Sequence, residues 1–282
     1  MENTVINTKF KQTNMAKEIL NKSNKKEEGL LKNSTDYGQA KYNYEEEFWK
    51  GEVDRRYEDN IEKEKIKRFL PKIKKNKSIV ELGAGFGRML KVYKDFDKIY
   101  LVDNADNMLE GSVKNIHRLG LKSKASALKA NLYNLSGVPK NNDVVVLIRV
   151  FHHIKDLDRA LKQINSIVKP GGYFIMEYAN KRNLLEIFRY YLGKPNLKPF
   201  DQNPSKRGSG IFYNFHPTYM ENKLKANGFA VKQTTQSSLF RSNIFKKVLG
   251  VNIISYLDIL IGGATGSLKL SPSIFYKCKK VS

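Results

Sequence analysis

Three glycines alternate with other residues in the segment ELGAGFGR, which covers residues 81–88 and follows a short apolar run. Glycine lets the backbone turn sharply, and it lets a ligand approach the main chain where a Cβ would block it. A nicotinamide or flavin fingerprint has the form G-x-G-x-x-G/A, in which the last small residue lets a helix pack close to the strand. Counting from Gly83, that position holds Arg88, so the spacing is G-x-G-x-G instead. The loop therefore predicts a ligand close to the backbone and disfavours a dinucleotide.

The elements that would position this loop are short apolar strands alternating with helices. We expect strands at 78–82, 98–102, 126–130, 143–148 and 173–177, a helix that begins at 89–93, and helices over 108–119 and 157–168. This alternation predicts a parallel, doubly wound α/β sheet. Because ligands of such sheets bind at the carboxyl ends of the strands, the residues that follow each strand are the candidates for chemistry.

Beyond residue 179 the alternation is interrupted. The sequence predicts a helix over 183–192, a loop over 193–210, a strand over 211–215, a helix over 217–227 that Gly228 closes, and strands over 229–235 and 273–277. Between the last two strands lies an insertion, residues 240–269. Its apolar run, 251–261, contains Asp258 and ends at the pair Gly262 and Gly263.

The N-terminal part has a different composition. Residues 1–40 are rich in Lys, Asn, Glu, Ser and Thr, and we expect a mobile tail with a short helix near 15–20. Residues 41–76 are expected to form a helical extension or lid that leads into a domain over 77–282. Pro71 ends its helical pattern of apolar residues, which are Tyr44, Phe48, Trp49, Val53, Tyr57, Ile61, Ile66 and Phe69.

The charge of the chain is strongly positive and unevenly placed. Lys and Arg number 51 against 28 Asp and Glu, a net charge of +23. Residues 77–180 carry 16 basic and 10 acidic side chains, whereas residues 181–282 carry 17 and 4, a net charge of +13. One cysteine, Cys278, excludes a disulfide framework, and four histidines leave few ligands for a soft metal. We therefore expect a soluble, cytoplasmic protein without a metal site, since no apolar run approaches the length of a spanning helix.

The glycine loop and four later segments resemble the motifs of class I S-adenosylmethionine (SAM)-dependent methyltransferases, of the small-molecule, type 11-like branch. The later segments are LVDNADNML at 101–109, LKANLYNL at 128–135, DVVVLIRVFHHI at 143–154 and the stretch 161–178 with its VKPGG turn. Their order and spacing match over about residues 77–180. The resemblance implies a Rossmann-like sheet of seven strands, five parallel with a C-terminal antiparallel pair, in an αβα sandwich.

The resemblance also assigns residues to the cofactor. Gly83, Gly85 and Gly87 would wrap the methionine part of SAM, and Glu81 would hold its ammonium group directly or through water. Asp103 would accept hydrogen bonds from both ribose hydroxyls. The remaining assignments are Asn104 and Met108 beside the adenine, Asn131 on its amino group, the backbone N–H of Leu132 on its ring, and Arg149 in the methionine pocket. Helix capping for the carboxylates, a turn role for Asn131 and core packing for Met108 are the alternatives.

Methyl transfer from a sulfonium is an in-line displacement, for which an enzyme aligns the acceptor and excludes water. An oxygen or nitrogen acceptor can also need a base, and the histidines near the carboxyl edge are His152, His153 and His216. We take His153 and His216 as the catalytic candidates, against a packing role for each. A metal site made of His152, His153 and Asp156 is disfavoured because adjacent histidines splay apart.

The acceptor would be chosen by the segments that decorate the core, including 181–217 and 240–269. The leading hypothesis is methylation of an O, N or C atom of a small molecule. An RNA, such as tRNA, or a protein acceptor is the second, with phosphates docking on the cationic residues Lys181, Arg182, Lys206 and Arg207. Nucleic acid is not favoured, since no RNA-recognition motif is present. The third is a non-catalytic SAM-binding or membrane-surface scaffold whose residues 240–262 contact an anionic membrane peripherally. A membrane-associated methyltransferase that acts on a lipid-soluble acceptor is a further alternative.

Overall fold

The computed structural model describes residues 55–72, 77–194, 197–206, 212–240 and 249–281. The chain divides into two compact units, Met1–Asp36 and Tyr37–Ser282, and every described residue lies in the second. The expected mobile tail and the first part of the helical extension lie outside the described residues.

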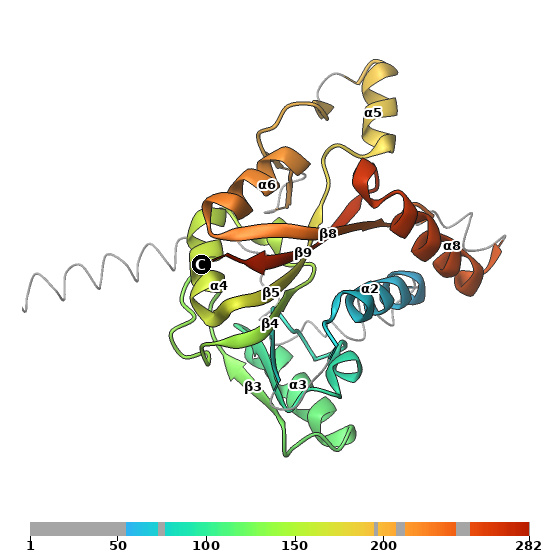
Figure 1. The fold of residues 1–282 in the computed structure, drawn as a ribbon. Coiled ribbons are helices and arrows are strands. Elements are labelled where there is room, and N and C mark those ends of the chain that lie inside the picture. Colours follow the sequence, from blue (N-terminus) through green and yellow to red (C-terminus); the bar gives the residue numbers. More distant parts are fainter. Residues whose placement is uncertain (1–54, 73–76, 195–196, 207–211, 241–248, 282) are drawn as a thin grey trace, which may run out of the picture. The chain divides into compact units, whose positions relative to one another are not determined.

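A seven-stranded mixed sheet forms the centre of the domain (Figure 1). Its strand order is β3 (Ala125–Lys129), β2 (Lys98–Asp103), β1 (Ser78–Leu82), β4 (Asn142–Leu147), β5 (Val168–Ala179), β9 (Ser273–Lys280) and β8 (Phe229–Ser237). The first five strands are parallel, and β9 lies antiparallel between β5 and β8. All six residues of β4 are buried, as expected for a central strand covered on both faces. The expected doubly wound fold with an antiparallel pair is confirmed.

Three helices follow the predicted pattern closely. They are α3 (Asp106–Arg118), α4 (Leu157–Ile167) and α6 (Pro217–Ala226). The side chain of Asp156 caps α4 by accepting the backbone N–H of Arg159 at 3.0 Å. Contacts between α4 and α6 include the ion pair of Asp158 with Lys223.

Two predicted elements are shorter than the sequence suggested. The helix expected to begin at 89–93 is a 3₁₀ turn, η2 (Leu90–Tyr93), because only a short connector separates the glycine loop from β2, and 3₁₀ turns serve such connectors. The strand expected over 211–215 is reduced to β7 (Tyr213–Asn214), which pairs with β6 (Ser205–Lys206). Residue 211 lies outside the described residues.

The helix α8 (Val251–Ala264) continues through the two glycines that close the apolar run. A Cβ on Gly262 would lie 2.0 Å from the carbonyl oxygen of Gln236 on β8, so glycine permits a close approach of helix to strand there. Gly263 has open space at the same point. The pair thus acts in packing rather than in ending the helix.

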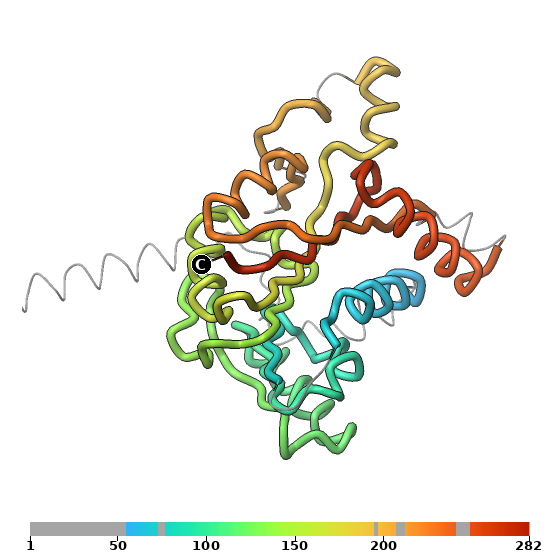
Figure 2. Tube along the Cα trace, in the orientation of Figure 1, coloured from blue at the N-terminus to red at the C-terminus, as the bar shows by residue number. Residues whose placement is uncertain are grey.

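The helical extension contains α2 (Arg56–Phe69), which ends just before Pro71 as expected. In Figures 1 and 2 the blue α2 lies beside the red α8, and the two helices are in contact. Buried apolar side chains at this contact are Tyr57, Ile61 and Ile254. The extension is therefore packed on the domain through the insertion that follows β8.

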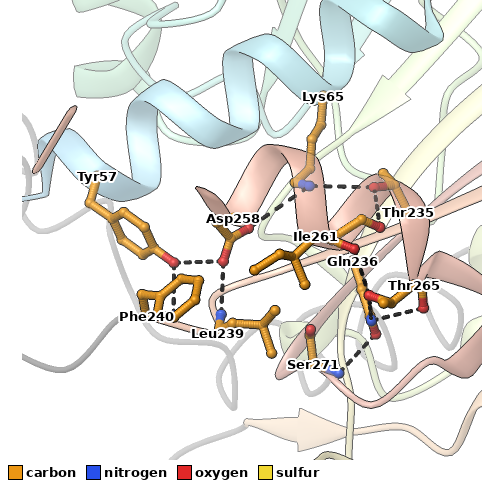
Figure 3. A network of polar contacts seen from close by, with 11 residues as sticks. Tyr57, Lys65, Thr235, Gln236, Leu239, Phe240, Asp258, Ile261, Thr265 and Ser271 are labelled. Atoms are coloured by element: carbon orange, nitrogen blue, oxygen red, sulfur yellow. Dashed lines mark hydrogen bonds and ion pairs between the residues drawn. The ribbon is translucent and has the colours of Figure 1, made fainter. Parts of the chain in front are cut away.

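A buried polar network joins α2, β8 and α8 (Figure 3). The hydroxyl of Tyr57 donates to Asp258 Oδ2 at 2.7 Å, and Oδ2 also accepts the backbone N–H of Leu239 at 2.9 Å. Lys65 Nζ lies 3.9 Å from Asp258 Oδ1 and donates to Thr235 Oγ1 at 3.3 Å. Burial lowers the pKa of Lys65 to about 8, although the nearby Asp258 opposes that shift. Because burying a charge without its partner is costly, the network favours one mutual placement of the three elements.

Candidate active site

The glycine loop follows β1 in a backbone conformation that requires glycine. The φ angles of Gly83, Gly85 and Gly87 are 70°, 56° and 78°, in the left-handed region. A Cβ on Gly83 would lie 2.3 Å from Val150 Cγ2, whereas one on Gly85 would have only Met108 Sδ nearby, at 3.9 Å. The loop therefore turns tightly against the end of β4 and leaves open space at Gly85.

Asp103 ends β2 and points at this loop. Its Oδ2 accepts the backbone N–H of Gly85 at 2.9 Å, and its Oδ1 accepts that of Ala105 at 3.1 Å. Burial raises the pKa of Asp103, while these backbone N–H groups oppose the rise. Each carboxylate oxygen keeps a second lone pair for a ligand. Asp103, the residue predicted to bind the ribose, thus lies beside the glycine loop.

Glu81 is buried in β1, two residues before the first loop glycine. Its Oε2 atom has no hydrogen-bond partner among the described residues. Burial raises the pKa of Glu81 to about 8, with the charge of Arg88 opposing the rise. Buried polar atoms are nearly always hydrogen-bonded, so an unpartnered carboxylate oxygen next to a glycine loop fits a cationic group of a ligand.

The residues assigned to the adenine differ in how far they are exposed to solvent. Met108 is buried beneath the loop, whereas Asn104 is exposed and Leu132 is half-buried. The side-chain oxygen of Asn131 accepts the backbone N–H of Tyr133 at 2.9 Å, which is an Asx turn. A second lone pair on that oxygen could still accept from an amino group. The adenine assignments stay predictions.

Arg149 follows β4 with a φ of 59°, outside the usual range of a non-glycine residue. Its backbone N–H donates to Glu177 Oε2 at 3.0 Å, and its Nε donates to Glu62 Oε1 on α2 at 2.7 Å. The same Glu62 pairs with Arg88, which also bonds Asp59 Oδ1 at 3.0 Å. Two arginines beside the glycine loop are thus held by one helix of the extension.

Sequence reasoning missed Asp59, Glu62 and Glu177. Asp59 and Glu62 are three residues apart and therefore share a face of α2, a spacing that could have marked an acidic helix face. Glu177 lies near the end of β5, where burial raises its pKa and Arg149 opposes the rise. Its place at the carboxyl edge of the sheet was a signal that the strand pattern already contained.

The candidate catalytic histidines lie in two places, His153 beside Phe212 and His216 at the start of α6. The ring of His152 stacks on Phe212 at 4.4 Å between centroids, and the ring of His153 meets it edge-on at 6.2 Å. His216 is the N-cap of α6, where its Nδ1 accepts the backbone N–H of Thr218 at 3.2 Å. Burial lowers the pKa of both His152 and His216, and neighbouring cationic side chains add to the shift. These imidazoles are therefore neutral near pH 7.

Neither a metal cluster nor a spanning helix is present in the part of the chain that the structure describes. No three His, Cys, Asp or Glu side chains converge there as ion ligands. No helix in the same residues has the length and apolar character needed to cross a bilayer.

Comparisons with known proteins show the family to which the chain belongs. A family model described as a methyltransferase domain matches residues 51–234, more than half of the chain. An uncharacterized protein of Methanocaldococcus jannaschii is 32% identical over 152 residues, which cover 51% of this chain and 63% of that protein. A ubiquinone/menaquinone biosynthesis C-methyltransferase of Haemophilus ducreyi is 24% identical over 108 residues, 37% of this chain and 42% of that enzyme. The chain thus spans less than two thirds of the length of each of these relatives.

A solved SAM-dependent methyltransferase of Clostridium acetobutylicum shares the fold with a TM-score of 0.51 at 16% identity, over 85% of this chain and 96% of that one. The chain therefore belongs to the methyltransferase family, in its class I, SAM-dependent form. SAM is the cofactor of this class. The residues present fit it. Glu81 has one carboxylate oxygen without a hydrogen-bond partner among the described residues, and each oxygen of Asp103 keeps a lone pair beside its backbone bond. A Cβ on Gly85 would have only Met108 Sδ nearby, at 3.9 Å.

Proposed function

We propose that the protein transfers the methyl group of SAM to an O, N or C atom of a small-molecule acceptor by in-line displacement. One observation carries the proposal: the buried carboxylate of Glu81, with its unpartnered oxygen, lies beside a glycine loop that Asp103 also contacts. When bound, SAM supplies an electrophilic methyl group. Glu81 would hold the ammonium group and Asp103 the ribose, so the chain fixes the direction in which an acceptor must approach.

On the acceptor side, Phe212 and the two adjacent histidines supply an aromatic wall that suits a planar or partly apolar acceptor. The cap bond of His216 occupies Nδ1, so the neutral ring carries its proton on Nε2 and acts there as a donor. We therefore propose His153 as the base, where one is needed, and His216 as a residue that positions the acceptor. The name of the Haemophilus relative, a C-methyltransferase, supports a carbon acceptor. Transfer to carbon requires no base to deprotonate an acceptor oxygen or nitrogen.

RNA as the acceptor receives less support. Lys181 is buried and donates to Asp201 and to the carbonyl oxygen of Asn203, and Arg182 donates to the carbonyl oxygen of Leu268. Arg207 lies outside the described residues. Of the three expected phosphate contacts that the structure describes, Lys206 is the one whose side chain is exposed. Two of the expected phosphate contacts, Lys181 and Arg182, are thus engaged within the fold.

The experiment that tests the proposal is a screen of small-molecule extracts for a SAM-dependent mass gain of one methyl group. We expect the wild type to produce it and Asp103→Ala to lose it. With the acceptor in hand, His153→Gln should lower kcat by about 100-fold or more if the acceptor atom needs a base. His117→Gln on exposed α3 is the matched control. No methylated product from any extract, with SAM binding intact, would contradict the proposal.

A further inference from the structure

In the helix α5 (Leu184–Tyr191) large apolar side chains are exposed and a charged side chain is buried, the reverse of an ordinary surface helix. Its only fully buried side chain is that of Glu186, which pairs with Arg189 at 3.2 Å. Phe188 is 61% exposed and Tyr191 is 73% exposed. With Leu184, Leu185 and Leu192 they form the α5 stripe, whose spacing of i, i+1, i+4, i+7 and i+8 places it on one helix face.

The helix α8 is apolar on two faces, and only one of them is covered. Its buried face packs on α2 and β8 through Ile254, Ser255, Asp258 and Gly262. On the other face Ile253 is 57% exposed and Tyr256 is 64% exposed, and Leu260 and Ile261 continue the row. These four residues are the α8 stripe. A row of four exposed apolar side chains on one helix face indicates an interaction site.

The two stripes lie on neighbouring segments. The backbone N–H of Leu184 at the start of α5 donates to the carbonyl oxygen of Leu270 at 2.8 Å. Arg182 donates to the carbonyl oxygen of Leu268, in the 3₁₀ turn that follows α8. Leu268 is itself exposed. In Figure 1 the yellow α5 accordingly begins next to the red segment that follows α8.

The charges of this region favour an anionic partner for the two stripes. Residues 181–282 contain four carboxylates against 17 cationic side chains, and each carboxylate has a partner within the fold. The pairs are Glu186 with Arg189, Asp201 with Lys181, Glu221 with Lys269, and Asp258 with Lys65. Lys194 and Lys198, which follow α5, are exposed. A second copy would bring like charges together, whereas an anionic lipid surface accepts both the lysines and the apolar side chains.

We propose that the α5 and α8 stripes dock the protein on an anionic lipid bilayer. The helices lie in the interface, with the apolar side chains among the acyl chains and the lysines at the headgroups. This inference does not depend on methyl transfer.

The test is co-sedimentation of the full chain with vesicles of phosphatidylcholine, with or without about 30% phosphatidylglycerol. The wild type should bind the anionic vesicles at least about tenfold more tightly than the neutral ones. Replacing Phe188 and Tyr191 by Ser, or Ile253 and Tyr256 by Ser, should lower the partition coefficient by about tenfold. The control is Val113→Ser, which removes a side chain that is 42% exposed on α3.

Replacing Lys194 and Lys198 by Gln should weaken anionic binding by about tenfold, and replacing Lys114 and Lys122 on the cofactor side should leave it unchanged. SAM binding by calorimetry should be the same in every variant, which shows that each is folded.

The proposal is overturned by wild-type protein that does not bind anionic vesicles, or by stripe variants that bind as well as wild type. A dimer in solution that the serine variants convert to monomer, without vesicle binding, would overturn it in favour of a second copy. Absence of SAM binding by the wild type would contradict the proposed function and leave the membrane result standing.

Discussion

Glu81 and Asp103 lie on the cofactor side of the sheet. Asp103 accepts backbone N–H groups, and Glu81 keeps one buried oxygen, Oε2, without a hydrogen-bond partner among the described residues. The carboxylates of residues 181–282 are instead paired with lysine, arginine or tyrosine side chains. Free carboxylate oxygens fit a ligand with an ammonium group and hydroxyls, whereas a surface of exposed lysines and apolar side chains fits an anionic partner. Within one domain, the cofactor side thus suits a cationic group and the surface of residues 181–282 suits an anionic partner.

The largest expected effect follows from replacing Asp103, the residue predicted to bind the ribose. Asp103→Ala should weaken SAM binding by about 1,000-fold, because two hydrogen bonds to a charged group are lost. Calorimetry measures this, and a thermal melt checks that the loop remains folded without its bonds to Gly85 and Ala105. Asp95→Ala, on the exposed turn before β2, should bind SAM normally. Undiminished binding by Asp103→Ala would remove the ribose assignment.

The next largest effect concerns the junction between α2 and the cofactor loop. Glu62→Ala should lower the free energy of unfolding by about 2–4 kcal/mol, because it leaves the charges of Arg88 and Arg149 without their shared partner. Urea denaturation followed by fluorescence is the measurement. Glu64→Ala, which breaks an exposed pair with Arg68 on the same helix, should change stability by less than about 0.5 kcal/mol. Equal effects of the two variants would show that α2 does not hold the loop.

Two adjacent glycines of α8 allow a direct comparison of a packed and an open position. Gly262→Ala should destabilise the fold by about 1–3 kcal/mol, because its Cβ would meet the carbonyl oxygen of Gln236. Gly263→Ala has open space and should stabilise the helix by about 0.5–1 kcal/mol. Thermal unfolding of both variants decides the point, and an equal melting temperature would mean that α8 does not pack on β8 as described.

The last effect is a pH dependence of the ligand-free protein, which is spread over several pH units. The pKa of Glu81 rises from its usual 4.5 to about 8 on folding, so between these values the native state binds a proton that the unfolded state lacks. Stability should therefore fall as the pH rises from 4.5 to about 8, and Glu81→Gln should flatten that slope. Because a ligand ammonium favours the ionised carboxylate, SAM binding near pH 7 should release a proton, measurable by calorimetry in buffers of different ionisation enthalpy. Binding without proton release would contradict the role of Glu81.

Much of the cofactor side could be predicted from the sequence because its signals are local. Apolar runs define β1, β2 and β4 to within about a residue, and the glycine spacing defines the loop that Asp103 contacts. The contacts of α2 could not be predicted, since nothing near Glu62 in the sequence indicates that Arg88 and Arg149 lie beside it. The same holds for α5, whose periodicity is that of a packed helix although its apolar face is exposed. Tertiary contacts decide which face of a helix is covered, and one sequence does not contain them.

We expect the glycine loop, Glu81 and Asp103 to hold SAM. The decisive measurement is a crystal structure of the full chain with S-adenosylhomocysteine, because this product keeps the amino group and the ribose. We predict that the ligand ammonium lies within hydrogen-bond distance of Glu81 Oε2, directly or through one water, and that Asp103 accepts from both ribose hydroxyls. A ligand whose ribose lies away from Asp103 would contradict the account.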